Sequence, residues 1–181
     1  MELHQLDRRR FLGRGAVCAA ALSGAVAPLF AALPASALEA PAGKVILTIT
    51  GGVTEMNDNG AASFDLAMLE KLPSRTFATK TPWFAQPRKF TGVSMQVLLK
   101  AVGAHPGSVS AVALNDYRVD IPLEDFTERG AMLAYLVDDQ PMTVRQKGPL
   151  VIIYPFDDEP ELRNAVHYSR AIWQLRSLEL R

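Results

Sequence analysis

Residues 89–99 read KFTGVSMQVLL, and the second half of this stretch has the pattern of a helix. Ser94 is a favourable residue for a helix N-cap. Apolar residues then recur at the spacing that places side chains on one face of a helix: Met95, Leu98, Leu99 and Val102. Gly103 follows, as glycine often does after a last helical turn. The sequence therefore predicts an amphipathic helix that packs against a core.

Short apolar segments bounded by Pro, Gly, Asn or Asp make up most of the remaining chain. A second helix is predicted from Ser63 to Leu72, and a loop around Pro82 and Pro87. Strands are predicted at residues 44–50, 75–79, 110–114, 117–121, 132–137, 150–154 and 173–180. Many short strands with few helices indicate an α+β fold built on mixed sheets.

The first 37 residues have the composition of an export signal. Four arginines lie among residues 8–14, an alanine-rich apolar run covers 16–33, and Ala35-Ser36-Ala37 has the small-x-small pattern of a cleavage site. The apolar run is shorter than the roughly 20 residues that a spanning helix needs. We therefore predict cleavage near Ala37, a mature domain of residues 38–181 in the periplasm, and no stable membrane insertion of that domain.

The stretch DRRRFLG, with Arg8-Arg9 as its central pair, resembles the twin-arginine export motif. An arginine-rich signal for the general secretory route is the alternative. The twin-arginine route carries folded proteins, often with a cofactor already inserted, so this resemblance is a pointer toward a cofactor.

The composition of the mature chain excludes several classes of function. Of the 19 basic and 19 acidic residues, residues 38–181 keep 15 and 17, and this slight negative balance argues against a nucleic-acid partner. The single cysteine, Cys18, lies in the signal, so the mature chain offers no thiolate as nucleophile or metal ligand. His105 and His167 stand 62 positions apart without patterned carboxylates, and no metal site is predicted.

Five phrases carry a resemblance to a known family. They are KFTGVSMQVLLKAVGA (89–104), AVALNDYRVDIPLEDF (111–126), LAYLVDDQPM (133–142), KGPLVIIYP (147–155) and AIWQLRSLEL (171–180). In this order and at these separations they resemble the molybdopterin-binding domain of the sulfite oxidase family, and among its members the short, single-domain periplasmic oxidoreductase-like proteins. The resemblance extends from about Lys44 to the C-terminus.

The resemblance implies a pterin dithiolene that holds molybdenum, with one cysteine thiolate of the protein bound to the metal. A soft sulfur ligand of this kind fixes the geometry of the metal and tunes its potential. The cysteine of active members falls at about Thr79, Lys80 or Thr81 of this chain, where no cysteine stands. A cofactor-contacting arginine of active members falls at Val151. Lys147, before Gly148, is a candidate to replace part of that positive charge.

Two further positions are candidates for a ligand site. Asn115-Asp116-Tyr117 matches the turn written Asp-Gly-Tyr in many relatives, where the tyrosine faces the substrate; the alternative is a hairpin turn with a packed tyrosine. Trp83 either lines the mouth of a pocket or completes the core.

Two hypotheses about function follow. The first is an exported, non-catalytic ligand-binding or sensory module, a pseudoenzyme that holds no cofactor and acts on a small molecule or a membrane signalling partner. The second is a molybdenum-cofactor oxidoreductase that passes electrons to a membrane redox partner. The absent cysteine and arginine favour the first, and the twin-arginine resemblance favours the second.

Overall fold

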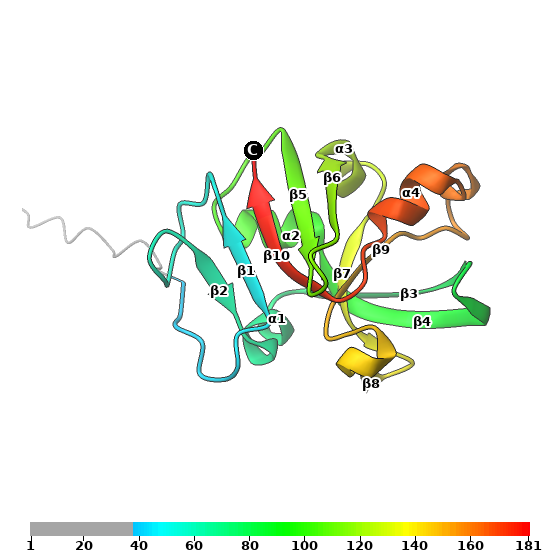
Figure 1. Cartoon of the computed structure of the whole chain (residues 1–181), viewed down its shortest axis with the longest axis horizontal. Coiled ribbons are helices and arrows are strands. Elements are labelled where there is room, and N and C mark those ends of the chain that lie inside the picture. The colour runs from blue at the N-terminus through cyan, green and yellow to red at the C-terminus, as the bar shows by residue number, and fades with distance from the viewer. Residues whose placement is uncertain (1–37) are drawn as a thin grey trace, which may run out of the picture. The chain divides into compact units, whose positions relative to one another are not determined.

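Two five-stranded sheets organise residues 38–181, which are the residues that the computed structural model describes (Figure 1). The predicted α+β class, with mixed sheets of short strands and few helices, is confirmed. The predictions made on residues 1–37, including the export signal and its arginine pair, lie outside the described residues. Among residues 38–181, no helix has the length and hydrophobicity needed to cross a membrane.

The first sheet joins the two ends of the described chain. Its strand order is β2-β1-β10-β5-β6, with β1 and β10 parallel and the other pairs antiparallel. The strands are β1 (Leu47–Thr50), β2 (Ala62–Phe64), β5 (Ser108–Ala113), β6 (Arg118–Pro122) and β10 (Leu175–Leu180). Because β10 lies between β1 and β5, the last strand of the chain completes the middle of this sheet.

The second sheet is antiparallel and is dominated by one long hairpin. Its strands are β3 (Ser74–Thr81), β4 (Phe84–Ser94), β7 (Met132–Val137), β8 (Gln140–Pro141) and β9 (Val151–Ile153). The predicted loop around Pro87 is wrong, because Pro87 lies within β4. At Pro87, β4 pairs only with β3, because its pairing with β7 begins at Phe90. The other edge of β4 is therefore free here, and a proline, which has no N–H to donate, is tolerated.

Four short helices and two 3-10 turns connect the strands. They are α1 (Leu66–Lys71), α2 (Met95–Ala101), α3 (Glu124–Thr127), η1 (Val144–Gln146), η2 (Pro160–Leu162) and α4 (Ala165–Arg170). The predicted start of the first helix at Ser63 is wrong, because Ser63 pairs with Thr48 in β2. Asp65 is the N-cap instead and accepts a hydrogen bond from the Met68 amide at 2.9 Å. That bond and one from the Gly43 amide lower the pKa of Asp65.

The stretch KFTGVSMQVLL forms the centre of the core. Phe90 and Val93 of β4 are fully buried, and α2 buries Met95, Leu98 and Leu99 as predicted. Gly92 stands where β4 passes closely over β7: a Cβ atom at this position would lie 2.0 Å from the carbonyl oxygen of Leu133. The glycine is therefore needed for the close approach of two backbones rather than for a turn.

Candidate functional site

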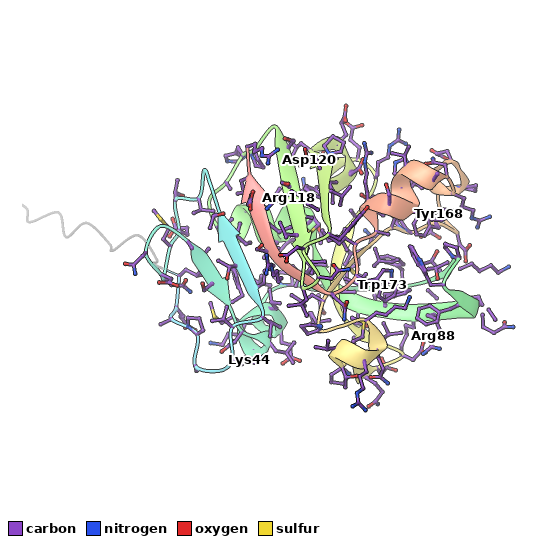
Figure 2. The ribbon with its side chains drawn as sticks, viewed as in Figure 1. Lys44, Arg88, Arg118, Asp120, Tyr168 and Trp173 are labelled. Atoms are coloured by element: carbon purple, nitrogen blue, oxygen red, sulfur yellow. The ribbon has the colours of Figure 1, made fainter. Side chains whose placement is uncertain are left out.

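Three aromatic rings from separate parts of the chain meet beside the β3–β4 hairpin. Trp83 lies at the turn between β3 and β4. Tyr168 lies on α4, and Trp173 lies in the connection between α4 and β10 (Figure 2). The Trp83 ring meets the Trp173 ring edge-on at a centroid distance of 5.4 Å and the Tyr168 ring at 6.1 Å. Such edge-to-face contacts are favourable for aromatic pairs. The rings thus join the hairpin to α4 and to the start of β10.

A hollow of about 290 Å³ opens beside these rings, and we call it the Tyr117 hollow. Its walls include both indoles and Tyr168 together with three polar residues: Asn115, Tyr117 and Lys147. The Asn115 side-chain oxygen accepts a hydrogen bond from the Tyr117 amide at 3.2 Å, so this segment is also a turn. The Tyr117 hydroxyl donates to the carbonyl of Ser169 at 3.2 Å. The segment is therefore a turn, but Tyr117 is exposed rather than packed, and it lines the hollow. Trp83 both packs against the core and lines the hollow.

Lys147 is held at the edge of the Tyr117 hollow by an unusual backbone conformation. It ends η1 with a φ of 69°, and its carbonyl accepts a hydrogen bond from the Gln174 amide at 3.0 Å. Its ammonium nitrogen lies 5.8 Å from the centroid of the Trp173 ring, within the range of a cation–π contact. Gly148 is buried next to it and faces Met142, since a Cβ on Gly148 would lie 2.3 Å from the Met142 carbonyl oxygen.

A second hollow, of about 390 Å³, shares Lys147 and Trp173 with the first, and we call it the Arg145 hollow. Phe84 and Trp173 contribute its aromatic walls, and Arg145 and Lys147 contribute positive charge. A third cation, Arg88, lies 4.9 Å from the Phe84 ring centroid and forms an ion pair with Asp138. Figure 2 shows Arg88 on β4 and Tyr168 on α4, on either side of Trp173.

The three residues at the expected position of the metal-binding cysteine do not open onto either hollow. Thr79 is fully buried, and its hydroxyl accepts a hydrogen bond from the Asp157 amide at 3.1 Å. The amide of Lys80 donates to the Asp157 carboxylate at 2.8 Å, while its side chain is exposed. Thr81 is buried, and its hydroxyl has no hydrogen-bond partner within residues 38–181. Asp157 also forms an ion pair with Arg163, so the segment after β9 covers β3 at Thr79 and Lys80.

The position expected for a cofactor-contacting arginine is filled by an apolar core contact. Val151 begins β9, pairs with Ala134 of β7, and forms a bridge with Trp173. It is fully buried. No positive group therefore reaches the site from this position.

Two protein groups that the resemblance implies for a molybdenum dithiolene cofactor, a thiolate and an arginine, do not stand at the expected positions. The positions expected for the thiolate hold Thr79, Lys80 and Thr81, of which Thr79 accepts a hydrogen bond from the Asp157 amide. The position expected for the arginine holds a buried valine, Val151. Within residues 38–181, no group of three or more His, Cys, Asp or Glu side chains is arranged to hold a metal ion.

A separate polar cluster lies beneath α4, away from both hollows. The buried carboxylate of Asp125 accepts a hydrogen bond from the Tyr154 hydroxyl at 2.7 Å and pairs with Arg170 at 3.2 Å. His167 meets the Tyr154 ring edge-on at a centroid distance of 5.6 Å. Burial raises the pKa of the Tyr154 hydroxyl and lowers the pKa of His167. This arrangement keeps a negative charge paired inside the fold.

Of the predicted candidates, four meet in one place and five do not. The structure brings Trp83, Asn115, Tyr117 and Lys147 together around the Tyr117 hollow. Of the other five, Asp116 forms an ion pair with Arg176. The remaining four make backbone or core contacts instead: Thr79, Lys80, Thr81 and Gly148. Three further residues line the hollows and were not among the predicted candidates: Tyr168, Trp173 and Arg145. One indication for Trp173 was present in the sequence, which is that it lies in the phrase AIWQLRSLEL. The apolar residues of that phrase were fully explained by a strand, so Trp173 was not considered for the site.

Comparison with known proteins gives a match to a family and a likeness to solved structures. Residues 69–156 match the family described as "oxidoreductase molybdopterin binding domain". The fold is similar to that of the sulfane dehydrogenase SoxCD from Paracoccus pantotrophus, with a TM-score of 0.55 and 15% sequence identity. The match covers 74% of this chain and 37% of the SoxCD chain. No curated protein sequence matches this chain.

Proposed function

This chain belongs to the sulfite oxidase-type family of molybdopterin-binding oxidoreductase domains, and we propose that it is a member that binds a small molecule without redox chemistry at molybdenum. It spans about a third of the SoxCD chain that it resembles, so the activity of that larger protein is not carried over. In this proposal the chain has the fold of the family, and a hollow at its surface binds a small molecule.

One observation carries this proposal: the contact between Thr79 and Asp157. Thr79 is one of the three residues at which the family resemblance places the metal-binding cysteine, and its hydroxyl accepts a hydrogen bond from the Asp157 amide. The Asp157 carboxylate in turn accepts one from the amide of Lys80. A metal ligand must face the space that the metal occupies, whereas this hydroxyl is fully buried and also donates to the Lys80 carbonyl. Valine at position 151 supports the same conclusion.

The Tyr117 hollow is the proposed ligand site. Its aromatic walls offer flat apolar surface, while the Tyr117 hydroxyl, the Asn115 amide and the Lys147 ammonium offer directed polar contacts. This combination of apolar walls with a few polar groups is typical of small-molecule sites. The hollow is small and lies at the surface, which favours a weakly held, exchangeable ligand over a permanently bound cofactor.

Export completes the proposal. The arginine-rich segment before residue 38 favours the periplasm, where a binding module reports to a membrane signalling partner. Replacement of both Arg8 and Arg9 by lysine is expected to stop export of the folded chain, as measured by cell fractionation. Unchanged export of the double variant would contradict the twin-arginine part of this proposal.

The ligand site is tested through the two indole N–H signals of the mature protein, which come from Trp83 and Trp173. In NMR spectra of ¹⁵N-labelled protein, a panel of small carboxylates, phosphates, amino acids and nucleosides is added one at a time. We expect at least one compound to shift the Trp83 signal saturably in the wild type and in the Arg145→Gln control. The shift should weaken in Asn115→Ala, which alters only the Tyr117 hollow. A panel that moves neither signal in the wild type would contradict the proposed site.

The alternative function is a molybdenum-cofactor oxidoreductase that passes electrons to a membrane redox partner. The family match at residues 69–156 favours it. The two functions differ in one measurable quantity, which is the molybdenum content of protein purified from cells that make the cofactor.

A further inference from the structure

The Arg145 hollow combines an apolar interior with positive charge at its edge. Its volume is about 390 Å³, near the lower end of the roughly 300–1,000 Å³ range of small-molecule pockets. Phe84 and Trp173 line it with aromatic rings, and Val137 and Met142 add aliphatic surface. A volume of this size with two flat walls suits a body of one or two fused rings.

The charges around this hollow are not balanced. Its one carboxylate, Asp138, forms an ion pair with Arg88, which in turn lies against the Phe84 ring. The same carboxylate accepts a hydrogen bond from the amide of Lys89 at 2.9 Å. Asp138 is therefore already satisfied by Arg88 and Lys89 of β4.

The two remaining cations, Arg145 and Lys147, form no ion pair with a carboxylate of the described residues 38–181. Within residues 38–181, the ion pairs of the chain involve other arginines and lysines. Both line the hollow from one short segment, because Arg145 lies in η1 and Lys147 directly follows it. The positive φ of Lys147 fixes where that side chain leaves the backbone.

From this geometry we infer that the Arg145 hollow is a second ligand site, which binds a flat, apolar carboxylate. The rings and aliphatic side chains receive the body of the ligand, and Arg145 and Lys147 receive its carboxylate. Charge-assisted hydrogen bonds to a guanidinium and an ammonium select an anion over its neutral analogue. This site is separate from the Tyr117 hollow, although Lys147 and Trp173 line both.

The test uses 2-naphthoate as the probe and 2-naphthamide as its neutral counterpart of nearly the same shape. Binding to the mature protein is measured by quenching of tryptophan fluorescence and by calorimetry. We expect 2-naphthoate to bind about tenfold more tightly than 2-naphthamide, as one charge-assisted hydrogen bond provides. The preference should shrink in high salt, because the cations are exposed to solvent.

Variants separate this site from the rest of the surface. Arg145→Gln is expected to weaken 2-naphthoate about tenfold and to leave 2-naphthamide unchanged. Lys100→Gln removes a charge of the same sign from an exposed position on α2 and should change neither affinity. Asn115→Ala, confined to the Tyr117 hollow, should also leave 2-naphthoate binding unchanged. Because Arg145 and Lys100 are exposed, their variants are expected to keep the wild-type melting temperature.

Three results would overturn the inference: equal affinity for the two probes, loss of 2-naphthoate binding in Lys100→Gln to the same extent as in Arg145→Gln, or no binding of 2-naphthoate at all. Loss of 2-naphthoate binding in Asn115→Ala but not in Arg145→Gln would show that the anion binds in the Tyr117 hollow. That result would also overturn the inference. Each result leaves the proposed function to be judged by its own NMR experiment.

Discussion

Thr79 and Asp157 are joined by a hydrogen bond of 3.1 Å from the Asp157 amide to the Thr79 hydroxyl, across 78 residues of sequence. The bond connects the end of β3 to the segment after β9, where the Asp157 carboxylate also receives the amide of Lys80. Thr79→Val keeps the shape of the side chain but leaves the Asp157 amide without its acceptor. We expect a loss of about 1–2 kcal/mol in the free energy of unfolding, measured by urea denaturation. Thr79→Ser, which retains the hydroxyl, should lose less, and equal losses would contradict the role of this bond.

Gly92 is predicted to be the most sensitive position of the stretch that identifies the fold. A Cβ there would lie 2.0 Å from the Leu133 carbonyl oxygen and 2.5 Å from the Ala134 Cα, both parts of β7. Gly92→Ala should therefore cost about 3 kcal/mol or more of unfolding free energy, measured by chemical denaturation. Gly107→Ala is the matched control, because the nearest atom to its added Cβ is 3.7 Å away. A Gly92 variant as stable as the Gly107 variant would show that β4 and β7 are farther apart.

The helix within this stretch was predictable, and the glycine contact was not. The spacing of Met95, Leu98 and Leu99 is a local property, so residues a few positions apart decide it. The role of Gly92 depends on Leu133, forty-one positions later, and no local pattern contains that pairing. Pro87 was placed in a loop for the same reason: the side of β4 that lacks a partner strand becomes visible only in the sheet.

The site was predictable in part. Tyr117 and Lys147 were identified through the family resemblance and Trp83 through the size of its side chain, and the structure places all three around one hollow. Tyr168 and Trp173 join them because α4 and the connection to β10 pack beside the hairpin, which is a long-range arrangement. Thr79 was expected near a metal position, and only the fold shows that its hydroxyl is closed off by Asp157.

Tyr154 is predicted to stabilise the fold through the buried carboxylate of Asp125. Tyr154→Phe removes the 2.7 Å hydrogen bond and leaves Arg170 as the partner of that charge. We expect a loss of about 1–3 kcal/mol in unfolding free energy, measured by urea denaturation. Tyr135→Phe is the matched control. Tyr135 is also buried, but its hydroxyl makes no hydrogen bond within the described residues, so the free energy of unfolding should change by less than about 0.5 kcal/mol. Similar losses in both variants would contradict a specific role for the Tyr154 hydroxyl.

His167 is predicted to make the stability of the fold depend on pH. Burial against Tyr154 lowers its pKa below the ordinary value of 6.5, since the folded protein disfavours the charged imidazole. The charged side chains that surround it are two arginines and two acids: Arg129, Arg170, Asp125 and Glu159. Unfolding then takes up a proton below pH 6.5, so the contribution of His167 to stability is full above that pH and declines as the pH falls toward the folded-state pKa.

Melting temperatures between pH 7.5 and pH 5 provide the measurement. His167→Gln should flatten the decline on the acid side, while His105→Gln, at an exposed position, should keep the wild-type slope. Identical slopes in the wild type and in His167→Gln would contradict this assignment.

The central claim is that this member of a molybdopterin-binding family does not hold the cofactor. Its most direct test is the molybdenum and pterin content of wild-type protein, purified after export from a host with intact cofactor synthesis. A cysteine-containing member of the family, produced in the same host, serves as the positive control. The account predicts molybdenum far below one atom per chain and no fluorescent pterin oxidation product. Stoichiometric molybdenum together with pterin in correctly processed protein would contradict it.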